Sequence, residues 1–227
     1  MQDTQVRTAD ADATVRVWDP FVRAFHWTLV VAFFAAYVTD DDVLAVHVWA
    51  GYAVGGLVLL RVVWGFIGPR HARFSDFVFA PMTVWRYAID LLQLRAERHL
   101  GHSPVGGAMV VALLVGLAAT VWSGLETHAV ENSAGPLAMP NQALRSASPA
   151  GPLIVTSARA DDRHRDDDRR ENDEGDEGDD VWEELHEVLA DLVFVLVILH
   201  IGGVALASIV HRENLVRSMI TGDKRAL

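Results

Sequence analysis

Apolar residues in this chain are gathered into four long runs, which are separated by charged segments and by segments rich in glycine and proline. Each run approaches or exceeds the roughly 20 apolar residues that an α-helix needs to cross a bilayer. The third run, VGGAMVVALLVGLAATVWSGL, contains no charge, whereas a helix on a soluble core would carry a polar face. The pattern therefore predicts transmembrane helices at 21–39, 43–67, 105–125 and 182–210.

The segment 74–100, FSDFVFAPMTVWRYAIDLLQLRAERHL, separates apolar from basic residues with helical spacing. It predicts an amphipathic helix that lies at the membrane interface, where it serves as a connector or docks a partner. The chain then divides into residues 1–125, with the first three spans and this helix, the loop 126–181, and residues 182–227, with the fourth span and a tail. The fold class is an all-α membrane protein, a four-transmembrane-helix bundle.

The loop 126–181 is rich in proline, alanine and serine at first and strongly acidic afterwards. Residues 161–180 contain 12 acids and 4 arginines, a net charge of −8 out of −11 for the whole chain. Such a composition buries little apolar surface and predicts a disordered acidic loop. Two interpretations stay open: a solvated linker, or a surface that attracts a basic partner.

Basic residues next to the spans predict the orientation of the chain in the membrane. Arginines and lysines flank the start of the first span, the connection between spans two and three, and the end of span four, whereas the turn TDDD after span one has none. The N-terminal segment lacks the apolar core of a signal peptide. We therefore expect a multi-pass protein of the cell (inner or plasma) membrane with both termini cytoplasmic, although six arginines in the loop 126–181 oppose this assignment.

The chain has no cysteine, which excludes disulfides, iron–sulfur clusters and haem attached through Cys-x-x-Cys-His. Histidines are the remaining candidates for a redox centre, and four of the ten lie inside the spans: His26, His47, His186 and His200. The 14 residues between the two on span four correspond to a rise of roughly 21 Å and a rotation that returns to within about 40° of the start. Both imidazoles therefore lie on one helix face, near opposite sides of the membrane.

The alternating direction of the spans sorts these histidines by depth into the pairs His26/His200 and His47/His186. Two imidazoles from different helices are the ligands of a non-covalent b-type haem, a cofactor that lies inside helix bundles. A bis-histidine iron has no open position and therefore suits electron transfer. Two haem b groups are thus predicted, and the alternatives are a site for a transported metal ion or histidines that only pack between helices. Small residues near the histidines would leave room for a macrocycle or a neighbouring helix: Gly51, Gly55, Gly202 and Gly203.

Arg61 is a charge within the otherwise apolar second span. An intramembrane arginine normally has a partner, so it is a candidate to bind a propionate of the cytoplasmic-side haem, or it extends to the interface. The quinone site is not placed by the sequence, although Arg70, His71 and His102 lie on the cytoplasmic side.

Several ordered motifs resemble the bacterial cytochrome b561 family, which includes the b-type cytochrome subunit of nickel-dependent hydrogenase. They are VWDPFVRAFHW (17–27), HVWAGY (47–52), RVVWGFIGPRHARFSDF (61–77), GHSPVGG (101–107), WEELHEVLADL (182–192) and HRENLVRSMITGDKR (211–225). The resemblance implies a four-helix bundle with two b haems whose ligands are one histidine on each of spans one and two, and two on span four. These positions fall on His26, His47, His186 and His200, and only the acidic loop departs from the compact family pattern.

The resemblance implies electron transfer between the quinone pool and a partner, either a hydrogenase or a c-type cytochrome, by a subunit rather than a stand-alone enzyme. A superoxide-to-quinone oxidoreductase is the alternative, which the acidic periplasmic segments disfavour because an anionic substrate needs positive charge. A non-redox membrane transporter or anchor is the third possibility. The acidic balance and the membrane spans speak against a nucleic-acid partner.

Overall fold

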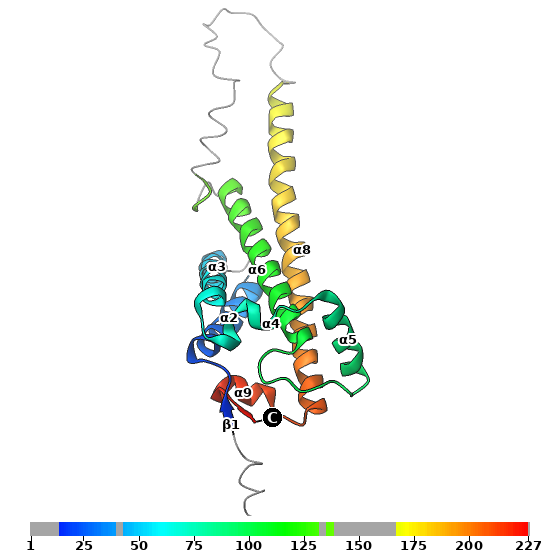
Figure 1. Cartoon of the computed structure of the whole chain (residues 1–227). Helices are drawn as coiled ribbons and strands as arrows, with labels where there is room; N and C mark the ends of the chain where they lie inside the picture. Colours follow the sequence, from blue (N-terminus) through cyan, green and yellow to red (C-terminus); the bar gives the residue numbers. More distant parts are fainter. Residues whose placement is uncertain (1–13, 40–42, 132–134, 139–166, 227) are drawn as a thin grey trace, which may run out of the picture. The chain divides into compact units, whose positions relative to one another are not determined.

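The computed structural model describes residues 14–39, 43–131, 135–138 and 167–226, with the side chains of 131 and 167–180 excepted. Within these ranges the protein is mostly helical, and four helices are long and apolar enough to cross a membrane (Figure 1). They are α2 (Pro20–Val38), α3 (Leu44–Ile67), α6 (Pro104–Glu131) and α8 (Asp167–Val210). The predicted all-α membrane fold with four spans is confirmed.

Contacts in space between backbone segments divide the protein into two compact units. The first contains the residues up to Ala118 and from Leu192 onward, and the second contains Ala119–Asp191. The first unit therefore holds α2, α3 and the C-terminal part of α8, while the second holds the end of α6 and the start of α8.

Local sequence sets the ends of the first two spans. The Asp19 side chain accepts a hydrogen bond from the Val22 N–H (3.0 Å) and Pro20 occupies the first turn, so α2 begins there. Helix α3 ends at Gly68, whose N–H donates to the Trp64 carbonyl (2.8 Å), and Pro69 cannot continue the helix.

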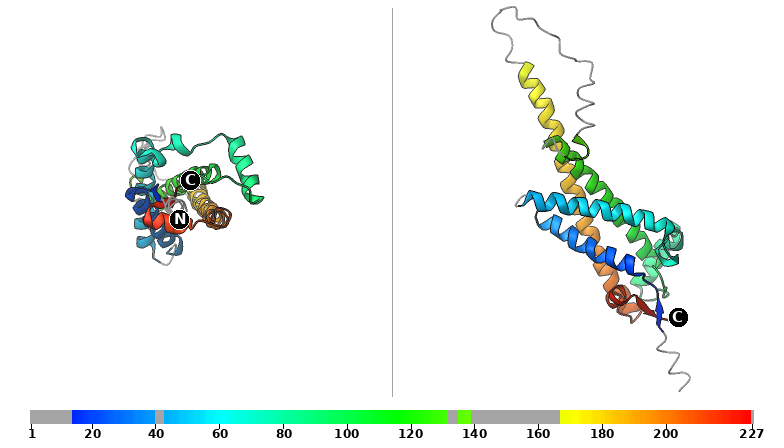
Figure 2. Two further views of the ribbon diagram at one scale, coloured as in Figure 1. Left: turned by 60° about the horizontal axis from the view of Figure 1, so that its bottom comes forward. Right: turned by 90° about the vertical axis from the view of Figure 1, so that its left-hand side faces the viewer.

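Helices α2 and α3 form an antiparallel hairpin, which the right-hand view of Figure 2 shows side by side. The rings of Phe21 and Trp64 meet near its open end (centroids 4.3 Å apart). Helix α2 also contacts α8 within the first unit, because Tyr37 stacks on Phe194 at 4.7 Å and 9°. These aromatic contacts hold the three helices that carry His26, His47 and His200.

The predicted continuous helix over 74–100 is wrong in its extent. Instead, a 3₁₀ turn at Arg70–Ala72 leads into α4 (Phe74–Phe77), extended residues follow, and α5 covers Pro81–Leu92. The residues before a proline avoid helical backbone, so Pro81 starts a new helix, and Leu94 with φ 59° ends the turn after it. Helix α5 is nevertheless amphipathic, with Tyr87 and Leu91 buried on one face and Arg86 and Asp90 exposed on the other.

The helices on either side extend into the segment 126–181, which the sequence predicts to be a disordered loop. Helix α8 begins at Asp167 rather than at the start of the fourth span, and α6 continues past residue 125 to Glu131. Once a helix is nucleated, each further residue adds one backbone hydrogen bond, so an apolar helix can extend into a charged segment. Residues 139–166 lie outside the described residues, and their predicted disorder stays a prediction.

A short sheet joins the two ends of the chain, which the sequence did not predict. Strand β1 (Thr14–Arg16) pairs antiparallel with β2 (Asp223–Arg225), directly after α9 (Leu215–Thr221). Gly222 (φ 92°) makes the turn between α9 and β2, a conformation that favours glycine. The pairing places the segments that flank the first and last spans at the same end of the first unit.

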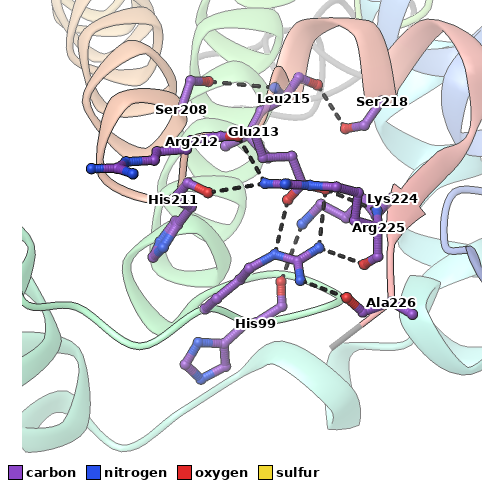
Figure 3. A network of polar contacts seen from close by, with 11 residues as sticks. His99, Ser208, His211, Arg212, Glu213, Leu215, Ser218, Lys224, Arg225 and Ala226 are labelled. Atoms are coloured by element: carbon purple, nitrogen blue, oxygen red, sulfur yellow. Dashed lines mark hydrogen bonds and ion pairs between the residues drawn. The ribbon is translucent and has the colours of Figure 1, made fainter. Parts of the chain in front are cut away.

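A network of charged groups closes this end of the first unit (Figure 3). Arg98 donates from Nε and Nη2 to both carboxylate oxygens of Glu213 (3.2 and 3.1 Å). Lys224 Nζ donates to the His99 carbonyl (3.2 Å), and Arg225 Nη2 to the Arg212 carbonyl (2.8 Å). The loop before α6 is thereby tied to the C-terminal tail, which follows it by more than 100 residues.

Candidate haem-ligand histidines

His26 and His200 are brought together across α2 and α8. Their ring centroids are 6.4 Å apart, with an angle of 54° between the ring planes. Two imidazoles that bond one metal ion through nitrogens at about 2 Å have ring centres roughly 6 Å apart. The pair thus has the separation of two axial ligands on opposite sides of one metal.

The surroundings of this pair suit a bulky, metal-containing ligand better than a bare ion. His26 Nδ1 is buried and has no hydrogen-bond partner among the described residues. Among the described residues, no three His, Cys, Asp or Glu side chains converge in a way that could hold a metal ion. A site made of protein ligands alone normally uses four, so two histidines fit a metal whose other ligands come from a macrocycle.

Some of the glycines beside the ligand candidates have open space around them. An added Cβ at Gly51, one turn after His47, or at Gly203, one turn after His200, would meet no described atom within 4 Å. By contrast, a Cβ at Gly116 would approach Val193 Cγ2 to 2.9 Å, so that glycine serves close helix packing. Side-chain volume is thus missing next to two of the four histidines.

His47 is oriented by the neighbouring helix of the hairpin. Its Nδ1 lies 3.0 Å from the Ala36 carbonyl oxygen. A carbonyl only accepts hydrogen bonds, so Nδ1 carries the proton and Nε2 is the nitrogen with the lone pair. This is the tautomer of a histidine that binds a metal through Nε2 while its other nitrogen is held in place.

His186 has an equivalent arrangement within the second unit. Its Nδ1 lies 2.9 Å from the Thr120 carbonyl oxygen and 3.1 Å from Oγ of Ser123, which is 1% exposed. Gly124 permits this contact, because a Cβ there would come to 2.8 Å from His186 Cε1. Sequence reasoning missed these groups on α6, although a serine and a threonine in a charge-free span were the available signal.

Arg61 does not extend to the surface. Its side chain is 3% exposed, its guanidinium carbon lies 5.5 Å from the Phe74 ring centre and 5.6 Å from that of Phe77, and its Nη1 has no partner among the described residues. The interpretation as a side chain that reaches the interface is therefore wrong. A buried guanidinium needs an anionic partner, which keeps the propionate interpretation.

The three residues considered for the quinone site have different surroundings. Arg70 Nε and His71 Nδ1 both contact the carboxylate of Asp76 (3.4 and 3.1 Å) near the surface. His102 instead lies between the rings of Trp18 and Phe77, with centroid distances of 4.7 and 4.5 Å. His102 thus packs on the ring that Arg61 also contacts, whereas the direct polar contacts of Arg70 and His71 are with Asp76.

Four apolar spans and a facing pair of intramembrane histidines define the class of a membrane haem protein. A model of the prokaryotic cytochrome b561 family matches residues 17–222, which is most of the chain. The chain belongs to this family, and it is therefore a membrane b-type cytochrome that takes part in electron transfer. Comparisons with curated proteins and with solved structures found no match.

Proposed function

We propose that this chain is a di-haem b cytochrome that carries electrons across the cell membrane between the quinone pool and a redox partner protein. The observation that carries the proposal is the pair His26/His200, at a separation that suits two axial ligands. His47 and His186 are assigned to a second haem because their depth in the sequence matches and because each Nδ1 is anchored to a carbonyl. Arg61 is assigned to a propionate of the haem between His26 and His200.

When bound, each haem would supply a one-electron redox centre, and the paired imidazoles would hold its iron. The residues of this chain hold the imidazoles in position, exclude water and leave no coordination site for a substrate. The bound haems would then exchange electrons with a quinone at one membrane face and with a hydrogenase or a c-type cytochrome at the other. Both termini are assigned to the cytoplasm because basic residues flank the spans and the strands pair the two ends.

The test is a reduced-minus-oxidised absorption spectrum of the purified protein in detergent, with the haem counted per chain. We expect two b haems. The variants His26→Ala and His200→Ala should both lose the same haem, and His47→Ala and His186→Ala the other, as judged by the potential of the haem that remains. A single haem in the unaltered protein would refute one pair, and different residual potentials within a pair would refute the pairing.

The quinone link has a separate test. A quinol analogue should reduce the haems rapidly in the oxidised protein, and a failure to do so would remove the quinone from the proposal while leaving the haems in place. A pulse of superoxide serves as the comparison, because rapid reduction by superoxide would favour the alternative oxidoreductase. Addition of a hydrogenase or a c-type cytochrome to the reduced protein then identifies which partner accepts or donates electrons.

A further inference from the structure

Arg61 on α3 and His102, just before α6, are 41 positions apart in the sequence and meet at one aromatic ring. The Phe77 ring centre lies 5.6 Å from the Arg61 guanidinium carbon and 4.5 Å from the His102 ring centre. Phe77 itself is 0% exposed, and its carbonyl lies against Gly107, where a Cβ would not fit. The ring is thus a fixed support that holds both polar side chains close to each other.

Each of the two side chains presents a buried nitrogen without a partner. Among the described residues, neither Arg61 Nη1 nor His102 Nδ1 has a hydrogen bond. A buried polar group without a partner is costly, and a buried charge more so. Two such nitrogens beside one ring indicate that a ligand with acceptor atoms completes the site.

The local charge favours an anion as this ligand. The nearby acids are already engaged: Asp19 accepts from the Val22 N–H, and the two carboxylate oxygens of Asp76 contact Arg70 and His71. Burial, together with the positive charges of Arg61 and Lys224, lowers the pKa of His102 to about 3. The imidazole is therefore neutral at physiological pH, and the guanidinium supplies the positive charge.

The site lies close to the level of His26 in the α2–α3 hairpin. The contact between the Ala36 carbonyl and His47 places these two residues at the same level of the antiparallel hairpin. His26 lies ten residues before Ala36 on α2, and residue 57 lies ten residues after His47 on α3, so His26 and residue 57 are also level. The contact of Phe21 with Trp64 gives a second count: five residues after Phe21 is His26, and five residues before Trp64 is residue 59, so His26 is level with residue 59 by this contact. Arg61 follows these positions by two to four residues, a distance of roughly 3–6 Å along the helix axis.

We propose that Arg61 and His102 together bind one propionate carboxylate of the haem held by His26 and His200, with Phe77 as their common support. The inference rests on the proposed function and adds His102 as a second positioning residue. A carboxylate matches the guanidinium fork and neutralises its charge, whereas a quinone headgroup is neutral and would leave the buried charge uncompensated. His102 Nδ1 donates the additional hydrogen bond that fixes the carboxylate.

The first test is a redox titration of the purified protein with both haems bound. Arg61→Gln removes the positive charge proposed to lie at the propionate and should shift the reduction equilibrium of one haem about tenfold toward the oxidised form, which is about 59 mV for one electron. The potential of the other haem should stay unchanged. Arg61→Lys keeps the charge and should retain most of the original potential, which a purely structural role of the side chain would not produce.

The second test uses His102→Phe, which keeps an aromatic ring between Trp18 and Phe77. It should retain both haems and change the propionate carboxylate bands in the reduced-minus-oxidised infrared difference spectrum. His99→Phe is the matched control, because this nearby loop histidine lies against Tyr87 and its Nδ1 bonds the Glu97 carbonyl instead. The control should leave the carboxylate bands unchanged.

The inference would be overturned if Arg61→Gln kept two haems with unchanged potentials and His102→Phe kept unchanged carboxylate bands. This result would leave the proposed function intact. Loss of quinol reduction in these variants at unchanged potentials and bands would also overturn it, and would assign the site to a quinone headgroup. Absence of haem from the unaltered protein would instead refute the proposed function itself.

Discussion

Two polar regions of the first unit differ in how completely their groups are satisfied. In the network around Arg98 and Glu213, the side chains of Arg98, Lys224 and Arg225 donate to carbonyl or carboxylate oxygens, and the Glu213 carboxylate accepts from Arg98 (Figure 3). Around His26, Arg61 and His102, buried nitrogens have none among the described residues. The comparison separates a structural cluster, complete without a ligand, from a site whose ligand completes it.

The difference follows from what each region must do. A satisfied network fixes the backbone and gains nothing from binding another molecule, because its donors are already used. A ligand site keeps its donors and lone pairs available, and the cofactor then contributes binding energy that the apoprotein lacks. Substitutions in the first region should therefore affect stability, and substitutions in the second should affect cofactor content and potential.

The largest effect is expected at a haem ligand. On the proposed function, His200→Ala removes one of the two histidine ligands of one haem, so that haem should be lost while the other stays bound. The measurement is the haem-to-chain ratio together with the reduced-minus-oxidised spectrum. His211→Ala, in the loop after the same helix, is the control and should keep both haems; equal haem loss in both variants would contradict the comparison.

A smaller effect, on stability rather than haem content, is expected at Glu213. Its side chain is 7% exposed and that of Arg98 is 20% exposed. Glu213→Gln leaves the Arg98 charge without its carboxylate, which should cost about 3 kcal/mol of unfolding free energy. Denaturant unfolding in detergent measures it. Loss of haem from the folded protein at native conditions would show that the network belongs to the haem site after all.

The carboxylate of Glu213 should also make the unfolding free energy depend on pH. Burial raises the pKa of Glu213, but hydrogen bonds from Arg98 and from the Arg225 N–H outweigh this, so the pKa lies below the ordinary value of 4.5. Its contribution to stability is therefore complete above pH 4.5 and is lost as the pH falls through the lower, folded-state pKa. Unfolding curves of the wild type and Glu213→Gln should converge in acid, and a constant difference would contradict this assignment.

A moderate effect on the proposed second haem is expected at Ser123. Ser123→Ala removes the hydroxyl beside His186 Nδ1 but keeps the Thr120 carbonyl contact. Loss of such a group behind a ligand typically weakens metal binding by roughly tenfold. Haem release to apomyoglobin should accelerate for one haem only. Thr127→Ala, whose hydroxyl donates to the Ser123 carbonyl one turn later, is the control and should release both haems at the wild-type rate.

The smallest effect is expected at the exposed pair between Arg16 and Asp223 in the two-stranded sheet. Its atoms are 3.8 Å apart and its side chains are 69% and 42% exposed. Arg16→Gln should change the unfolding free energy by less than about 1 kcal/mol and leave both haems in place. A loss as large as that of Glu213→Gln would show that exposure does not distinguish the two ion pairs.

The sequence by itself determined the features that depend on local composition. Hydropathy places the four spans because a helix in lipid satisfies its own backbone hydrogen bonds, whatever its neighbours are. The 14-residue spacing of His186 and His200 places both on one helix face, because the rotation per residue of an α-helix does not depend on its neighbours. Proline and glycine mark the ends of α2, α3 and α5 directly in the sequence.

Only the tertiary structure decided the features that join distant segments. These are the pairing of β1 with β2, the hydroxyl of Ser123 beside His186, and the meeting of Arg61 with His102 on Phe77. The start of α8 at Asp167 likewise depended on continuation of an existing helix rather than on local propensity. Such contacts depend on how helices pack, and a pattern along one chain does not specify which faces meet.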